Sequence, residues 1–135
     1  MKRFSVLLGG ALFLVACDRF WHLTVQATTS PRVTIGCVDT AVQRLTGLPT
    51  TLAGNDVTHF PTQLVNLGAG PYGAVVVLAR TPGDSTRLAM LGDWVGREPS
   101  ADTVAVLIAE YSRILTGLSR TCAGADPTIS VRRPE

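Results

Sequence analysis

Residues 100–124 read SADTVAVLIAEYSRILTGLSRTCAG, and their apolar side chains recur at the spacing of a helix. Ser100 is a favourable N-cap, the charge of Asp102 in the first turn favours the helix dipole, and Gly124 is a typical stop. The apolar stripe continues over about five turns and comprises Val104, Leu107, Ile108, Tyr111, Leu115, Leu118 and Cys122. Such a stripe predicts a helix that packs one face against a core.

A second helix is predicted earlier in the chain. It begins at Ser30-Pro31, with serine as N-cap and proline at the first position, and it ends near Thr46, just before Gly47. Its apolar residues are spaced by fours, with two more alongside: Val33, Cys37, Ala41 and Leu45, then Val38 and Val42. Each predicted helix therefore carries one cysteine on its buried face.

Strands are predicted between and around the two helices. The clearest hairpin joins residues 74–80 to residues 86–91 through a turn cluster at 81–85. Residues 20–26 alternate in polarity, as a half-buried strand does. Shorter strand-like segments lie at 50–52, 57–60, 64–67 and 128–131, with a turn predicted at Gly54-Asn55-Asp56. We expect a single domain over residues 31–135, an α+β two-layer sandwich with two antiparallel helices on one face of an antiparallel sheet.

The N-terminus has the features of an export signal. Lys2 and Arg3 precede an uncharged run of thirteen residues, Phe4 to Ala16. As a helix this run would rise about 20 Å, whereas the hydrocarbon core of a bilayer is roughly 30 Å thick. Its length and its basic flank therefore indicate a signal peptide rather than a membrane-spanning helix.

Leu14-Val15-Ala16-Cys17 resembles the lipobox of bacterial lipoprotein signal peptides, position by position. The resemblance implies removal of residues 1–16, attachment of diacylglycerol to the Cys17 thiol and acylation of the new N-terminus. Residues 17–30 would then form a lipid-anchored segment. Asp18 resembles the signal that retains enterobacterial lipoproteins in the inner membrane, which implies the periplasmic face of that membrane.

Other interpretations of the N-terminus stay open. One is an ordinary signal cut at Ala16 or after Val25-Gln26-Ala27, and another is a buried hydrophobic helix. The later cut would need a long, polar c-region that contains Asp18, Arg19 and His22. The mature part also resembles small bacterial lipoproteins of unknown role that have one cysteine in each of two helices.

Acylation of Cys17 would leave two cysteines, Cys37 and Cys122. In an exported protein such a pair predicts a disulfide. Closing so long a loop would disfavour the unfolded chain by about 4–5 kcal/mol in the chain-entropy model. The bond would join the start of one predicted helix to the end of the other, so the helices are predicted to be antiparallel neighbours.

Charge argues against two classes of partner. The 135-residue chain has twelve Lys plus Arg against ten Asp plus Glu, and loss of Lys2 and Arg3 with the signal leaves ten of each sign. A balanced charge argues against nucleic acid, whose binding surfaces are basic, and against polybasic attraction to anionic lipids. The expected partners are the membrane, through lipid on Cys17, and an envelope protein.

Phe20 and Trp21 allow two interpretations. They could form a foothold at the membrane interface, because aromatic rings favour the depth of the headgroups. Alternatively they belong to the first strand, with alternate side chains in the core. We favour the core, because a domain of this size needs its aromatic side chains inside.

No motif in the sequence predicts catalytic, cofactor or metal chemistry. Gly68 to Gly73 matches the letters of GxGxxG, but strand-like residues 74–78 follow where a dinucleotide fold needs a helix N-terminus. We therefore predict a loop there and no cofactor. His22 and His59 are isolated, no CxxC or HxxH spacing occurs, and GxSxG, HExxH and SxxK are absent from the sequence.

The sequence supports three functional hypotheses. The leading one is a small lipid-anchored envelope protein that binds or stabilises a protein partner at the membrane surface without catalysis. The second is a periplasmic inhibitor or ligand-binding module that contacts its target through an exposed loop, such as 68–73 or 94–99. The third is a hydrolase without a recognisable motif, in which His59 would have to meet a carboxylate in a pocket.

Overall fold

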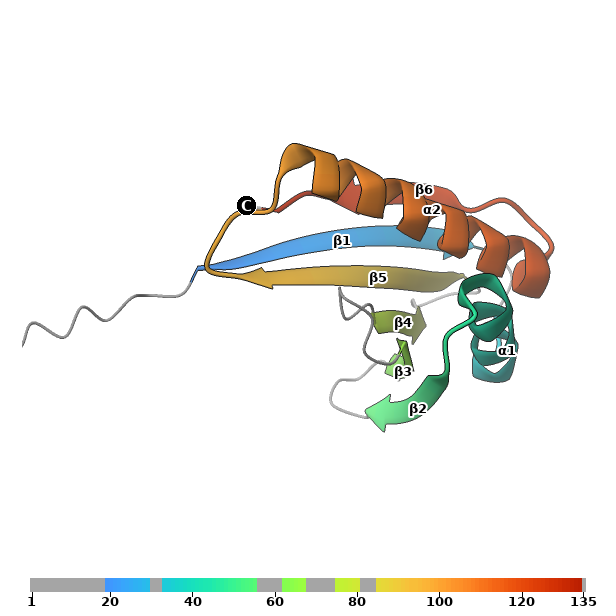
Figure 1. Cartoon of the computed structure of the whole chain (residues 1–135). Coiled ribbons are helices and arrows are strands. Elements are labelled where there is room, and N and C mark those ends of the chain that lie inside the picture. The colour runs from blue at the N-terminus through green and yellow to red at the C-terminus, as the bar shows by residue number, and fades with distance from the viewer. Residues whose placement is uncertain (1–18, 30–32, 56–61, 68–74, 81–84, 135) are drawn as a thin grey trace, which may run out of the picture.

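Six strands and two helices occupy the residues that the computed structural model describes, which are 19–29, 33–55, 62–67, 75–80 and 85–134. In chain order they are β1 (Phe20–Thr29), α1 (Ile35–Thr46), β2 (Thr50–Asn55), β3 (Thr62–Leu67), β4 (Val75–Arg80), β5 (Thr86–Val95), α2 (Ala101–Ala123) and β6 (Thr128–Arg132). The strands form one antiparallel sheet in the order β2-β3-β4-β5-β1-β6. Helix α2 packs on β1 and β5, while α1 contacts α2, β2 and β3 (Figure 1). The predicted α+β fold class is confirmed.

Strand β1 lies inside the sheet. It pairs with β5 over its full length, and on its other edge with β6 over residues 24–28. Residues 20–29, which precede the boundary expected at residue 31, thus belong to the same sheet as the later strands.

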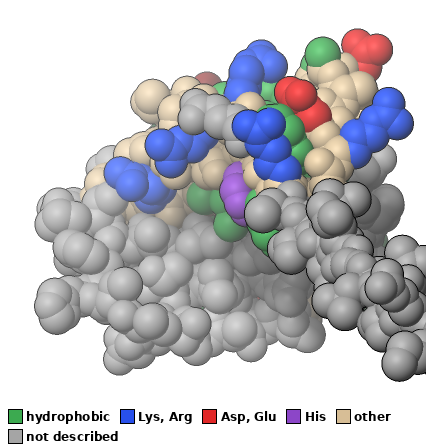
Figure 2. All heavy atoms as spheres, turned by 90° about the vertical axis from the view of Figure 1, so that its left-hand side faces the viewer, with side chains coloured by type: hydrophobic (Ala, Val, Ile, Leu, Met, Phe, Trp, Pro, Cys, Tyr) green, Lys and Arg blue, Asp and Glu red, His purple; other side chains and the backbone are tan. Residues whose placement is uncertain are grey.

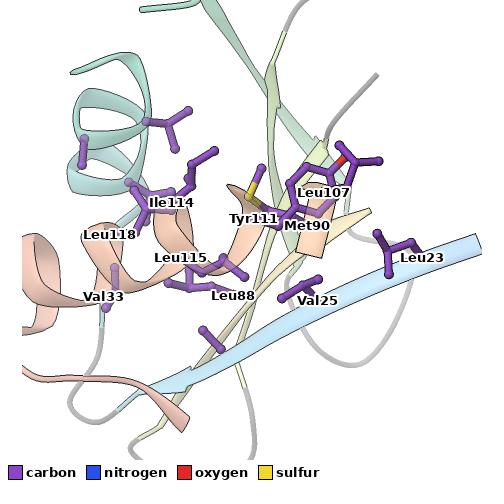
Figure 3. Close-up of a cluster of buried hydrophobic side chains, with 14 of the residues drawn as sticks. Leu23, Val25, Val33, Leu88, Met90, Leu107, Tyr111, Ile114, Leu115 and Leu118 are labelled. Atoms are coloured by element: carbon purple, nitrogen blue, oxygen red, sulfur yellow. The ribbon is translucent and has the colours of Figure 1, made fainter. Parts of the chain in front are cut away.

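The core lies between one face of the sheet and one stripe of each helix. The largest contribution comes from α2, and the cluster includes Leu23, Val25, Val38, Val42, Leu88, Met90, Val104, Leu107, Tyr111, Ile114, Leu115 and Leu118. Figure 3 shows labelled members of this cluster between α2 and the strands. The stripe predicted for residues 104–118 is thus buried, with Ile108 only partly covered and Ile114 as an additional member.

The caps of α2 are as predicted. The Ser100 hydroxyl accepts a hydrogen bond from the Thr103 N–H at 3.2 Å, and Gly124 ends the helix in the left-handed conformation at φ 70°. Only glycine adopts that conformation without a steric cost. In the described part of the chain, neither helix is long and apolar enough to cross a bilayer.

Helix α1 begins later than predicted. Ser30-Pro31 lies outside the described residues, and the N-cap is Thr34, whose hydroxyl accepts from the Cys37 N–H at 3.3 Å. The Val33 N–H, just before this cap, donates to the buried Thr86 hydroxyl at 3.1 Å, which ties the start of the helix to the start of β5.

Two strand boundaries also differ from prediction. Gly54-Asn55, predicted as a turn, lies in β2 and pairs with Gln63 and Thr62. Cross-strand hydrogen bonding therefore outweighs the local turn preference of these two residues. The strand predicted at 57–60 lies outside the described residues, and β5 continues to Val95, where β1 supplies a partner for the added length.

The predicted disulfide is present. It joins Cys37 near the start of α1 to Cys122 near the end of α2, with the Cα atoms 5.8 Å apart. Further along the contact, the Arg113 guanidinium donates to the Leu45 carbonyl at 3.4 Å. Along α1 the disulfide comes before the Leu45 contact, and along α2 it comes after the Arg113 contact, so the two helices run antiparallel.

Alanine substitutions at two helical glycines should separate helix propensity from helix–helix contact. An added Cβ at Gly36 meets nothing within 4 Å, whereas one at Gly117 lies 2.9 and 3.0 Å from the two δ-methyl groups of Leu45. We expect Gly36→Ala to raise the free energy of unfolding by about 0.5 kcal/mol. Gly117→Ala should leave it unchanged or lower it, because overpacking costs about 1–3 kcal/mol.

Urea denaturation of both variants checks this pair, with Gly36→Ala as the matched control. Equal stabilisation by both substitutions would contradict the close approach of α1 to α2 at Gly117.

Candidate functional site

The start of β1 and the end of β5 meet at one end of the molecule, on the left of Figure 1. We define residues 19–22 and 93–100 as the β1–β5 end. The Gly96 N–H donates to the Arg19 carbonyl at 2.8 Å, which ties the loop before α2 to the first strand. Because Arg19 is two positions after Cys17, this is also the described end that lies nearest in sequence to the predicted lipid site.

The inward side of the β1–β5 end is packed. Trp21 and Trp94 are cross-strand partners, and Trp21 is only 8% exposed, with its indole N–H donating to the Gly96 carbonyl at 3.5 Å. A Cβ at Gly92 would lie 3.2 Å from the Trp94 ring and 3.3 Å from the Tyr111 hydroxyl. Glycine at this position thus makes room for both rings. The core interpretation is confirmed for Trp21.

The outward side of the same end is different. Phe20 and Val95 are cross-strand partners, and they are 57% and 60% exposed. The Phe20 ring stacks on the His22 imidazole with centroids 6.4 Å apart, and His22 Nδ1 lies 2.7 Å from Asp93 Oδ1. The strand alternation that buries Trp21 places these four side chains on the other face. The core interpretation is therefore wrong for Phe20.

Charged side chains also lie at this end, on the side of the two tryptophans. The Arg19 guanidinium lies 4.9 Å from the centre of the Trp21 ring, a cation–π distance. Beside it is an open hollow of 560 Å³, lined by Trp94, Val95, Arg97, Glu98, Pro99 and Ser100. Figure 2 looks onto this end and shows arginine side chains close to hydrophobic ones. Of the predicted loop 94–99, residues 94 and 95 belong to β5, whereas residues 96–99 follow the strand and 96–98 are exposed; loop 68–73 lies outside the described residues.

The predicted site residues have separate places. Cys17 and His59 lie outside the described residues, whereas Cys37 and Cys122 form the disulfide at the α1–α2 contact. Within the described residues no three His, Cys, Asp or Glu side chains come close enough to hold a metal ion.

The contact between His22 and Asp93 is not predicted from the sequence, in which the histidine looks isolated. The two residues are 71 positions apart and become opposite one another only through the register of β1 with β5. Both side chains are more than half exposed, at 63% and 60%. Water competes for such a contact, so this pair suits surface recognition better than acid–base catalysis.

Tyr111 of α2 contacts β5 near the β1–β5 end, and its ionisation makes the stability of the folded state depend on pH. Its hydroxyl donates to the Leu91 carbonyl at 3.3 Å. Burial raises the pKa of the Tyr111 hydroxyl above its usual range, and the nearby negative charge of Asp93 raises it further. A tyrosine ionises with a pKa of about 10 in the unfolded chain. The folded state therefore loses stability as the pH rises through and beyond that value.

Absorbance titration near the tyrosinate band checks this expectation. In a Tyr72→Phe variant, Tyr111 is the remaining tyrosine, and its ionisation should occur above pH 10 and together with unfolding. In Tyr111→Phe, the loss of stability at high pH should be smaller. Ionisation of Tyr111 at an ordinary pH, with the protein still folded, would contradict its burial.

Comparisons with known proteins do not place this chain in a family. No family model matches the chain, and no curated protein matches its sequence. The function of the β1–β5 end is therefore inferred from its own residues.

Proposed function

We propose that this chain is a small lipid-anchored protein of the bacterial cell envelope, which binds or stabilises a protein partner at the membrane surface without catalysing a reaction. Diacylglycerol on Cys17 holds the folded part at the periplasmic face, and Asp18 favours retention in the inner membrane. The support comes from the cysteines, from the compartment that they indicate and from the exposure of the polar side chains.

The pairing of the cysteines is the observation that carries the anchor. The chain has three cysteines, and the bond between Cys37 and Cys122 uses two of them, so Cys17 is the odd one. An odd cysteine in an exported protein either pairs between molecules or remains a reactive thiol. A thioether to lipid removes that thiol, and Cys17 stands at the last position of Leu14-Val15-Ala16-Cys17.

The same disulfide supports an oxidising compartment. Disulfides persist in the periplasm and at cell surfaces, and they are rare in the cytosol, where thiols are kept reduced. A disulfide that links two helices of a domain this small therefore agrees with export through the signal at residues 1–16.

The binding role is supported by where the polar groups lie. His22 and Asp93 are in contact but mostly in water, whereas acid–base pairs in enzymes act in sites that exclude water. The sheet and the disulfide-linked helices instead form a fixed scaffold for residues 96–99, which follow β5 and are mostly exposed. A rigid scaffold that presents an exposed loop suits recognition of another protein.

One comparison of the wild-type protein with Cys17→Ala tests both halves of the proposal. Cells are fed labelled palmitate, and the protein is extracted from membranes in mild detergent and separated by size. The wild type should carry the label and elute with a stoichiometric protein companion. Cys17→Ala should lose the label, because alanine has no thiol to alkylate, and should lose the companion with its membrane attachment.

The matched control is the double variant Cys37→Ala/Cys122→Ala, which keeps the lipobox and should keep the label per molecule. Label on Cys17→Ala would contradict the anchor. A labelled wild type that elutes alone would contradict the partner.

A further inference from the structure

We propose that the β1–β5 end lies against the phospholipid headgroups of the anchoring membrane, with Phe20 and Val95 as its apolar contacts. This orientation rests on the proposed lipid at Cys17. In this orientation the domain makes a second, non-covalent contact with the membrane, and the β1–β5 end is the one that faces the lipid.

The tether between the lipid and the sheet is short. Three residue steps separate Cys17 from Phe20, the first residue of β1. At most about 3.6 Å per step, Phe20 lies within about 11 Å of Cys17. The headgroup layer of each leaflet is itself about 5–8 Å thick. A lipid on Cys17 therefore holds Phe20 at or just above the headgroups in every orientation of the domain.

The first residue of the sheet is also held firmly to its neighbour. Phe20 is paired with Val95, and the Gly96 N–H donates to the Arg19 carbonyl at 2.8 Å. Opposite residues in an antiparallel pair have Cβ atoms about 4.5–5.5 Å apart. Whatever brings Phe20 to the membrane surface therefore brings Val95 as well.

The side chains at this end suit the membrane interface. Phe20 and Val95 are large apolar side chains that stay more than half exposed although they are direct neighbours. Phenylalanine and other apolar side chains bind at the boundary between the headgroups and the acyl chains. The Arg19 guanidinium lies instead over the Trp21 ring, on the other face of the strand pair.

The charge of this end decides whether it contacts lipid through electrostatic attraction or through its apolar side chains. Arg19 and Arg97 are balanced by Asp93 and Glu98, and all four are exposed. Attraction to anionic lipids needs an excess of basic residues, which is absent among these four. The contact is therefore apolar and insensitive to salt, and it depends on the tether, which supplies the high local concentration that so small a patch needs.

Depth-dependent quenching on the lipid-bearing protein tests the orientation. In Val95→Cys the new thiol is the free one, because Cys37 and Cys122 are bonded to each other and Cys17 is acylated. The protein is extracted from membranes, checked for labelled palmitate, coupled to an environment-sensitive fluorophore and reconstituted into phosphatidylcholine vesicles. Emission at residue 95 should shift to the blue and be quenched by lipids with a spin label near the headgroup.

The matched control is Thr128→Cys, which is exposed and pairs with Thr28, eight positions along β1 from Phe20. That distance is about 26 Å, so emission at residue 128 should resemble that in water. Adding Phe20→Asp to Val95→Cys should abolish the blue shift while the palmitate stays. High salt should change neither signal.

Several outcomes would overturn the orientation. If the protein carries palmitate but the fluorophore emits equally at residues 95 and 128, the anchor stands and the contact of the β1–β5 end with the membrane is excluded. A blue shift at 95 without quenching by the spin-labelled lipid would assign that surface to a protein contact instead. Absence of palmitate would remove the anchor itself, and the orientation with it.

Discussion

The covalent bond between Cys37 and Cys122 is the constraint on which the rest of this structure depends. It closes 85 residues of chain, which disfavours the unfolded state by about 4–5 kcal/mol in the chain-entropy model. A domain of this size has a total stability of about 5–15 kcal/mol, so a single bond accounts for a large share of it. The bond also holds α1 beside α2, and α2 supplies the largest share of the core. By using two of three cysteines, it leaves Cys17 as the one whose chemistry needs explanation.

The disulfide and the β1–β5 end lie at opposite ends of α2. Ser100 caps the helix next to the β1–β5 end, and Cys122 lies 22 residues further on. At 1.5 Å per residue the separation is about 33 Å. A lipid at Cys17 would thus hold one end of α2 near the membrane, and the disulfide would stiffen the end that projects away from it. Because β1 starts three residues after Cys17, the domain has almost no linker, so its orientation follows from its own surface.

Local signals in the sequence predict the parts of the fold that depend on neighbours along the chain. Helix α2 has a regular stripe, a serine cap and a terminal glycine, and all three act within a few residues of each other. The errors occur where strand pairing decides instead. Ser30-Pro31 is a reasonable helix start, but the helix begins after the Thr34 cap. Gly54-Asn55 is a reasonable turn, but pairing with β3 keeps these two residues extended. The His22–Asp93 contact is invisible in the sequence for the same reason, since it exists only in the register of β1 with β5.

Non-reducing peptide mapping by mass spectrometry of the membrane-extracted protein tests the central claim most directly, because it reports the state of all three cysteines at once. The account predicts one cross-linked peptide pair that contains Cys37 and Cys122, and an N-terminal peptide that begins at Cys17 and carries diacylglycerol and an amide-linked acyl chain. A disulfide from Cys17 to either of the other cysteines, or three free thiols on a chain that still begins at Met1, would contradict it.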